Sequence, residues 1–521
     1  MKRQFLSFTL LLALSTWIAQ AATVRGTVSD TAGKPLQGVV VTDGYNFTQT
    51  NERGEYSLDS NLDKSRFVYL SVPGDYEIEQ TKGIPDLFYQ QLDKSKEINE
   101  HDFTLTPRKQ PIDGFVYLAI SDPQTIDERQ MKRFREETIP DLKQPKTDEH
   151  FERLRTEIIP PLQAATAAKK AQGVNQAAIL LGDIVWDSPQ LFAKVREQFA
   201  SLGIPVYGVI GNHDHDLRYP ALSNQKVTEE SYAERIYEDH FGPYNYSFNV
   251  GDAHIITLKD IDYYKDKKYD ERFGKEQLEW LKNDLSYVKP GTLVFINVHA
   301  PVFNQTDKGG GNAEDAESLK EIVGPYNVHI FAGHTHFFEN NQVTPNLYEH
   351  NIGAACGAWW AGHVNRCGAP NGYLVVEVKG NTATWYYKAT GHDSDYQFRV
   401  YKPNEFKSQA DYLVVNVWDW DPTYQVTWSE NGIEKGRMEQ FDDEDQDYID
   451  MHGKPSGVEK PGVMEAFDDE DQDYITMKEG KATGYHTSHL FRCHPSAGVK
   501  DVQIKVINRF GETFTKNVTL P

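Results

Sequence analysis

Five short apolar runs in the middle of the chain each end in a group of polar side chains. The runs cover residues 115–120, 177–181, 206–210, 294–298 and 328–332. Runs of this length predict buried strands. The Asp, Asn, Gln or His that follows each run often lies beside a Gly, which permits a tight turn. Because ligands collect at the carboxyl ends of strands in α/β sheets, the five strand ends predict one shared site.

The chemistry of these strand ends favours metal ions. The residues are Asp122, Gln124, Asp183, the segment Gly211-Asn212-His213-Asp214, His299, His334 and His336. A mixture of carboxylate, amide and imidazole groups suits manganese, iron or zinc rather than a thiolate site. A Gly-His-Thr-His alone is weak evidence, but all five groups in this order are a strong signal. We therefore predict a two-metal site.

The pattern of predicted secondary structure changes twice along the chain. Between the apolar runs lie amphipathic patterns at 149–170, 190–202, 229–240 and 275–287. This alternation predicts a layered α/β core with parallel or mixed sheets. Short strands separated by Gly, Pro and Asn turns predict all-β regions on both sides of it. The predicted domains are a signal peptide at 1–21, an N-terminal β-sandwich at 22–107, the core at 114–395 and a C-terminal β-rich domain at 405–521.

The N-terminus and the net charge limit location and partners. Lys2 and Arg3 precede an apolar stretch and the small-x-small site at 19–21, a pattern typical of a cleavable signal peptide. No later run reaches the roughly 18 apolar residues of a membrane span, so we expect export to the periplasm or beyond. The net charge of −23 argues against nucleic-acid polymers as partners. A small phosphate ester is compatible with it, because bound divalent cations reverse the field locally.

Two further features leave alternatives open. The three cysteines, Cys356, Cys367 and Cys493, are too few for a disulfide framework. A bridge between Cys356 and Cys367 and three small buried residues are both compatible with the sequence. An acidic segment at 438–449 recurs at 464–475. It lacks the glycine and terminal glutamate of a calcium-binding EF-hand loop, so a solvated acidic loop is favoured.

The order and identity of the strand-end residues resemble the calcineurin-like metallophosphoesterase family over residues 114–391. Segments at 244–258 and 276–285 are similar to that family's hairpin and helix. The motifs CGAWWAG, PNGY and YKATG resemble a secreted bacterial subgroup with an N-terminal sandwich and its own C-terminal domain. The N-terminal motifs GTVSDTAGKPLQGVVVTDG and TNERGEYSL resemble carboxypeptidase-regulatory-like sandwiches.

This resemblance implies a ligand set. Asp183 would bridge two metals, with Asp122, Gln124 and His336 completing the first site. Asn212, His299 and His334 would complete the second. Many relatives carry His where this chain has Gln124, and an amide oxygen is a harder ligand, which favours manganese or iron, with zinc as an alternative.

The resemblance also implies a mechanism. Two cations about 3.5–4 Å apart would acidify a bridging water into a hydroxide that attacks phosphorus. His213 would stabilise the transition state or protonate the leaving group, with Asp214 orienting its ring.

Five further residues are candidates for the surroundings of the metals or for substrate contacts. They are Asp187, His215, His363, Trp359 and Trp360. For the two histidines, an ordinary surface or core position is favoured over a substrate contact. The tryptophans are compatible with a pocket wall that stacks on the leaving group or with packing against the C-terminal domain.

The function predicted from the sequence is that of a secreted binuclear-metal phosphoesterase. Phosphomonoester, phosphodiester and pyrophosphate substrates all remain open, because they share one metal core. The alternative is a non-catalytic binding or scaffold protein built on the same core. Protein partners are not predicted.

Overall fold

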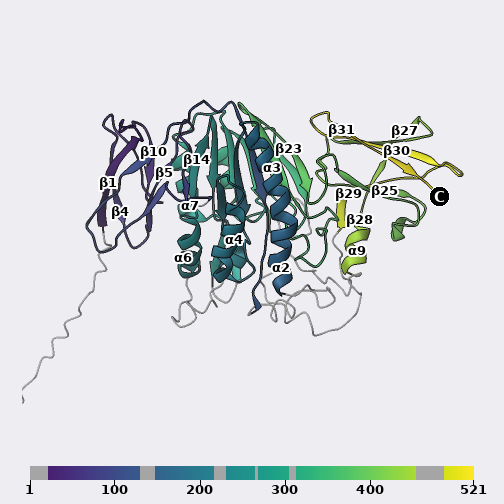
Figure 1. Cartoon of the computed structure of the whole chain (residues 1–521), viewed down its shortest axis with the longest axis horizontal. Helices are drawn as coiled ribbons and strands as arrows, with labels where there is room; N and C mark the ends of the chain where they lie inside the picture. The colour runs from purple at the N-terminus through teal and green to yellow at the C-terminus, as the bar shows by residue number, and fades with distance from the viewer. Residues whose placement is uncertain are drawn as a thin grey trace, which may run out of the picture.

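The computed structural model describes residues 21–81, 83–128, 147–215, 230–264, 268–303, 312–452 and 486–521. These residues form a central α/β region with a β-rich region on either side (Figure 1). The predicted α/β core with mixed sheets and extra β domains at both ends is therefore confirmed. Residues 1–20 of the predicted signal peptide lie outside the described residues. Among the helices described, none is long and apolar enough to cross a membrane.

The N-terminal region consists of two small sheets. Strands β10 (Phe103–Leu105), β1 (Ala21–Asp30) and β4 (Glu55–Asn61) form one, with β9 (Ile98–Glu100) also paired to β1. The other contains β3 (Phe47–Gln49), β2 (Val40–Thr42), β5 (Phe67–Ser71) and β8 (Tyr89–Gln91), and β6 (Gln80–Thr81) pairs with β7 (Ile84–Pro85). Buried and more exposed residues alternate along β4, as expected of a strand with one face in a core.

Two mixed sheets form the central region. The first has the order β13 (Val206–Val209), β12 (Asn175–Leu181), β11 (Gly114–Ile120), β22 (Gly372–Lys379) and β23 (Thr382–Ala389). The second has the order β14 (Tyr246–Val250), β15 (Ala253–Thr257), β18 (Leu293–Asn297), β19 (Asn327–Ala332), β21 (Leu347–Asn351) and β20 (Glu339–Thr344). Strands β11, β12 and β13 are parallel, as are β15, β18, β19 and β21. Parallel pairing places their carboxyl ends on the same edge of each sheet.

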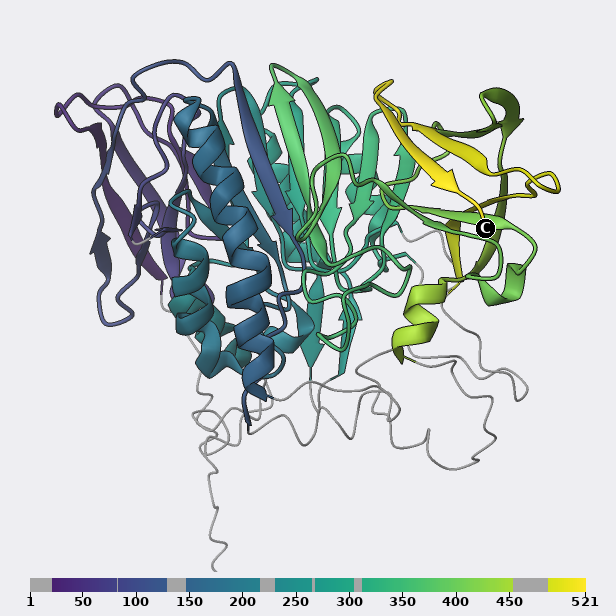
Figure 2. The same ribbon diagram turned by 45° about the vertical axis from the view of Figure 1, so that its right-hand side comes forward.

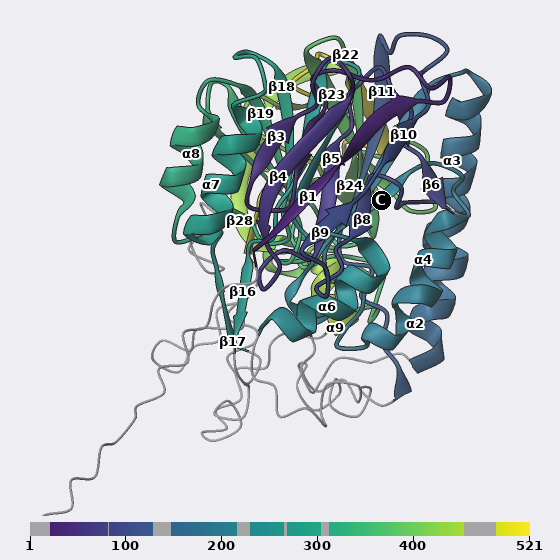
Figure 3. The same cartoon turned by 90° about the vertical axis from the view of Figure 1, so that its left-hand side faces the viewer.

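The strand β11 shows how the layers pack. Phe115, Tyr117 and Ala119 belong to a hydrophobic cluster shared with the second sheet, whereas Val116 and Leu118 belong to a cluster shared with helices. The helices of that cluster are α3 (Ile159–Ala171), the preceding π-helical turn Leu154–Ile158, α4 (Phe192–Ala200) and α6 (Glu230–Phe241); α2 (Thr147–Arg153) leads into the π-helical turn. Helices α7 (Gly274–Leu285) and α8 (Ala316–Val323) lie on the opposite side, against the second sheet (Figure 3).

The C-terminal region again contains two sheets. The first has the order β24 (Phe398–Tyr401), β25 (Leu413–Val417), β29 (His486–Cys493) and β28 (Glu439–Glu444). The second has the order β27 (Ile433–Arg437), β26 (Gln425–Glu430), β30 (Asp501–Ile507) and β31 (Thr513–Thr519). A short helix, α9 (Gln446–His452), follows β28. The central region also carries a hairpin of β16 (Ile261–Tyr264) and β17 (Lys268–Glu271). Within the described ranges, 3-10 turns occur at Pro189–Leu191, Asn212–Asp214 and Lys407–Gln409.

The first copy of the acidic segment is not the solvated loop that its composition favours. It forms β28 and the start of α9, and Asp445 between them is fully buried. The Asp445 carboxylate accepts hydrogen bonds from the backbone amides of Asp447 at 2.9 Å and Tyr448 at 3.2 Å, so it caps the helix. The second copy, at 464–475, lies outside the described residues. The three cysteines are free and buried, without the disulfide that the sequence left open.

Candidate metal centre

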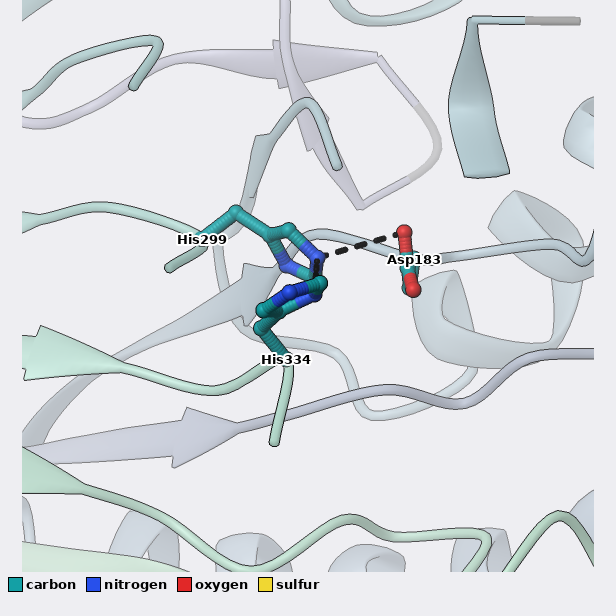
Figure 4. A group of neighbouring side chains, drawn as sticks. All are labelled: Asp183, His299 and His334. Atoms are coloured by element: carbon teal, nitrogen blue, oxygen red, sulfur yellow. Dashed lines mark hydrogen bonds and ion pairs between the residues drawn. The ribbon is translucent and has the colours of Figure 1, made fainter. Parts of the chain in front are cut away.

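The strand-end residues meet at one place. The ligand candidates, in chain order, follow β11, β12, β13, β18 and β19. Ligand atoms of Asp183, His299 and His334 lie within 4.8 Å of one another (Figure 4). The remaining candidates join this group through short contacts. Asn212 Oδ1 lies 3.0 Å from His299 Nε2, and Gln124 Nε2 lies 2.7 Å from Asp183 Oδ2. Asp122 connects the last two histidines, because its Oδ2 lies 3.0 Å from the His334 amide and its Oδ1 lies 3.5 Å from His336 Nε2.

The backbone at these positions is strained in a consistent way. Asp122, Gln124, Asp183, His334 and His336 have φ values of 47°, 35°, 45°, 68° and 52°. Non-glycine residues in the left-handed region cost on the order of 1–3 kcal/mol each and cluster at functional sites. Two glycines near these residues leave room for neighbouring side chains. A Cβ on Gly211 would collide with Asp183, and one on Gly333 would collide with Ser121.

The hydrogen bonds of His299 leave a lone pair facing other acceptors. Its Nδ1 lies 2.8 Å from the Leu181 carbonyl oxygen, so Nδ1 carries the proton in the neutral ring. Nε2 then faces Asn212 Oδ1 at 3.0 Å, His334 Nδ1 at 3.1 Å and Asp183 Oδ1 at 3.3 Å. Acceptors gathered around a lone pair repel one another unless a cation lies among them. This donor set therefore fits a metal ion.

His336 and Asp122 show the same arrangement. His336 Nδ1 donates to the Gly357 carbonyl at 2.6 Å, which leaves a lone pair on Nε2. That nitrogen and Asp122 Oδ1 face each other at 3.5 Å, and both are buried without a hydrogen-bond partner. Buried unsatisfied atoms cost about 1–3 kcal/mol each. A cation held between them removes that cost, so this pair fits a second metal ion.

The electrostatics of the group point the same way. Burial by itself lowers the pKa of His299, but the carboxylates of Asp183 and Asp122 outweigh it and raise that pKa to about 10. Burial by itself raises the pKa of Asp183, but His299, His213 and His334 hold it well below its usual range. The site therefore stabilises positive charge, whether carried by protons or by metal ions.

Gln124 lies beside the metal ligands in an unexpected orientation. Its amide nitrogen donates to Asp183 Oδ2 at 2.7 Å, and its amide oxygen lies 3.8 Å from Cys356 Sγ. In this orientation the nitrogen, rather than the ligand oxygen, faces the shared carboxylate. Its role as a ligand of the first metal remains a prediction.

His213 is held by a different carboxylate from the one predicted. Its Nδ1 lies 3.0 Å from Asp187 Oδ1, and its ring stacks on Trp186 with centroids 5.1 Å apart. Asp214 instead turns back to accept backbone N–H groups from Gly211, Ile184 and Val185 at 2.9, 3.2 and 3.1 Å. The prediction that Asp214 orients the His213 ring is therefore wrong, because the 3-10 turn Asn212–Asp214 directs its carboxylate to the backbone.

Comparison with known proteins identifies the group to which this arrangement belongs. The family models described as the N terminal of calcineurin-like phosphoesterase, calcineurin-like phosphoesterase, and the C terminal of calcineurin-like phosphoesterase match residues 22–108, 115–338 and 349–514. The chain belongs to the calcineurin-like phosphoesterase family. It is accordingly a phosphoric ester hydrolase of a family that uses a dinuclear metal centre, as predicted.

The individual proteins to which this phosphoesterase is similar share low sequence identity with it. It is 28% identical over 200 residues to a probable cyclic nucleotide phosphodiesterase from Synechococcus, which covers 37% of this chain and 71% of the relative. A dimetal phosphatase from Danio rerio is 14% identical with a TM-score of 0.33, over 53% of this chain and 99% of the other. A purple acid phosphatase from yellow lupin is 13% identical with a TM-score of 0.36, over 54% of this chain and 52% of the other.

The remaining candidates differ in how they relate to the phosphoesterase site. His215 is fully buried, stacks on Tyr263 and has its pKa lowered by burial to about 3. His363 is exposed and lies 3.0 Å from the Arg153 guanidinium. Trp359 stacks on His336 with centroids 4.7 Å apart, whereas the indole N–H of Trp360 donates to the Pro123 carbonyl at 3.0 Å. Trp359 therefore lies directly against a ligand candidate.

Sequence reasoning missed several contacts of the centre. Glu271 Oε1 and the Tyr269 hydroxyl, both on β17, each lie 3.5 Å from His334 Nε2. The buried Asp260 carboxylate accepts the backbone N–H of His299 at 3.0 Å. Trp186 lies between Asp183 and Asp187 in the sequence, so this position could have indicated that its side chain lies near the site. The β17 residues carry no such signal.

Proposed function

We propose that this protein is an exported enzyme that hydrolyses small phosphate esters at a two-metal centre. The observation that carries the proposal is the placement of two buried ring nitrogens: His299 Nε2 faces Asn212 Oδ1 and Asp183 Oδ1, and His336 Nε2 faces Asp122 Oδ1. Export is proposed from the signal-like segment at 1–21.

Each side chain has a defined part in this proposal. Asp183 would be shared by two cations; Asn212, His299 and His334 would hold one of them, and Asp122 and His336, with Gln124, would hold the other. When bound, a pair of such cations supplies a nucleophile at neutral pH and neutralises phosphoryl charge. Manganese or iron is favoured because oxygen ligands accompany the imidazoles.

His213 would protonate the leaving group. With Nδ1 bonded to Asp187, the proton to be transferred is carried on Nε2 and passes to the oxygen that leaves phosphorus. The stack of the His213 ring on Trp186 fixes the plane in which that nitrogen points. The carboxylate of Asp187 stabilises the imidazolium before the proton leaves, in the manner of other His–Asp pairs.

A phosphodiester or pyrophosphate substrate is the second candidate within this function. Two observations favour it over a monoester. The first is Gln124: the family resemblance implies His at this position in many members and Gln in some members that cleave such bonds. The protein from Synechococcus to which the chain is similar is described as a probable cyclic nucleotide phosphodiesterase.

The test compares three substrate classes with two variants. Purified protein is incubated with Mn²⁺ and an aryl phosphate monoester, a bis-aryl phosphate diester or an aryl diphosphate, beside Asp183→Asn and His213→Ala. We expect turnover by the wild type that both variants lose, with the diester or diphosphate cleaved faster than the monoester. Wild-type turnover no greater than that of Asp183→Asn with Mn²⁺, Fe²⁺ and Zn²⁺ would overturn the proposal.

A further inference from the structure

A helix of the C-terminal region reaches the surroundings of the metal centre. Helix α9 lies below the C-terminal sheets, beside the central region (Figure 2). Its Tyr448 is 2% exposed and shares a hydrophobic cluster with Trp186 and Trp359, against which Met451 also packs. Both tryptophans belong to the central region. The acidic segment thus contributes an aromatic side chain to a hydrophobic cluster that the central region otherwise forms.

The two tryptophans are the same ones that stack on site histidines. Trp186 lies against His213 and Trp359 against His336, with centroid separations of 5.1 and 4.7 Å and an interplanar angle of 28° in each case. Each histidine is also held at Nδ1, by Asp187 and by the Gly357 carbonyl. A bond at Nδ1 fixes where that nitrogen lies, and a stacked ring limits how far the imidazole tilts. Both constraints are needed to aim Nε2.

Helix α9 is anchored from two sides at its start. Asp445 accepts hydrogen bonds from the Tyr401 hydroxyl at 2.9 Å and from Asn416 Nδ2 at 2.8 Å, both in the C-terminal sheets. The same Asn416 Nδ2 donates to the carbonyl of Cys367, and a Cβ on Gly368 would collide with Asp445. The helix therefore cannot shift relative to the catalytic region without breaking buried hydrogen bonds.

We propose that α9 is part of the catalytic unit and that Tyr448 is a positioning residue for it. Its ring holds Trp186 and Trp359 against His213 and His336. Through Trp186 it controls the aim of the proton donor, and through Trp359 it controls a ligand of the first metal. The activity side of this proposal rests on the proposed function, whereas the metal side is measured independently of turnover.

The test uses one disruptive, one conservative and one control variant. Tyr448→Ala opens the cluster, and Tyr448→Phe keeps the ring. Met438→Ala is the control, because Met438 is buried in the core of the C-terminal sheets and lies outside the tryptophan cluster. For each protein, kcat and KM are measured, together with the Mn²⁺ concentration that gives half of the maximal thermal stabilisation.

We expect Tyr448→Ala to lower kcat by about 10- to 100-fold with KM little changed, as small misplacements of catalytic groups do. We expect its Mn²⁺ midpoint to rise by about 10-fold, in the range produced by losing a residue that supports a metal ligand. Tyr448→Phe should restore both values. Met438→Ala should lower the melting temperature while leaving kcat and the Mn²⁺ midpoint near the wild type.

Two outcomes would overturn the proposal. One is a Tyr448→Ala protein that is destabilised as Met438→Ala is but keeps the wild-type kcat and Mn²⁺ midpoint, which would make Tyr448 a packing residue only. The other is an equal rise of the Mn²⁺ midpoint in Met438→Ala. A wild type without turnover would refute the proposed function instead, and the Mn²⁺ midpoints would still decide the role of α9.

Discussion

The metal-binding part and the proton-transfer part of the centre are built differently. His299 and His336 are fixed at Nδ1 by backbone carbonyls, and their Nε2 atoms face the carboxylates of Asp183 and Asp122 at 3.3 and 3.5 Å. His213 is fixed by the Asp187 carboxylate and by stacking on Trp186. A carbonyl holds a ring in the neutral tautomer that a metal requires, whereas a carboxylate favours the imidazolium that an acid requires.

Asp183 connects the two parts. Its Oδ1 lies 3.3 Å from His299 Nε2 and accepts the backbone N–H of His213 at 2.9 Å. The difference between the parts therefore predicts that substitutions separate into those that remove metal, those that slow chemistry with metal retained, and those that do neither. Among the residues that contact the site histidines through a carboxylate, Asp183 should affect metal binding and chemistry together, as Tyr448 should do indirectly through the two tryptophans.

The largest effect is expected for Asp183→Asn. Losing the shared carboxylate removes several kcal/mol of metal-based stabilisation, which corresponds to a fall in kcat of roughly 10³-fold or more. Elemental analysis should find fewer than two metal ions for each chain. A variant that retains two ions and measurable kcat would show that the two parts do not share this residue.

The second comparison sets His213→Ala beside its neighbour Asn212→Ala. Loss of a general acid lowers kcat by about 10²- to 10⁴-fold, and we expect His213→Ala to keep both metals. Asn212→Ala should instead raise the Mn²⁺ concentration for half-maximal activity by at least about 10-fold, with kcat largely recovered at saturating Mn²⁺. Equal metal loss in the two variants, measured by elemental analysis, would contradict the assignment of metal binding to Asn212 and proton transfer to His213.

A smaller effect is expected for Asp187→Asn. A buried hydrogen bond to a charged group is worth about 1.5–3 kcal/mol, so kcat should fall by about 10- to 100-fold. The metal content should not change, because Asp187 bonds His213, which is not a proposed metal ligand. The activity of Asp187→Asn/His213→Ala should equal that of His213→Ala alone. Additive losses in the double variant would mean that Asp187 acts through something other than His213.

Much of the centre could be predicted because its residues follow strands directly. A ligand one to four residues beyond a parallel strand has little choice of position, since the strand ends share one edge of a sheet. Asp183 and Asn212 are examples: each is the second residue after an apolar run, and both lie near His299. The α/β pattern of the core was predictable for the same reason, as it depends on local periodicity.

The partner of His213 and the role of α9 could not be predicted in this way. Asp214 is adjacent in sequence, but a 3-10 turn points it at backbone amides, and Asp187 reaches the ring from another strand end. Tyr448 lies in a segment whose acidic composition favours solvent exposure. Its burial comes from tryptophans over eighty residues away in the chain, and no local pattern encodes such a contact.

The smallest effect on catalysis is expected for Asp214→Asn, which is the sharpest check of the corrected assignment. The carboxylate accepts three backbone N–H groups, and the amide keeps one acceptor oxygen, so we expect a loss of about 1–3 kcal/mol of unfolding free energy. The melting temperature should fall by several degrees in a calorimetric scan, while kcat, measured well below that temperature, and metal content stay close to the wild type. A kcat as low as that of Asp187→Asn, without lower stability, would restore Asp214 as the residue that orients His213.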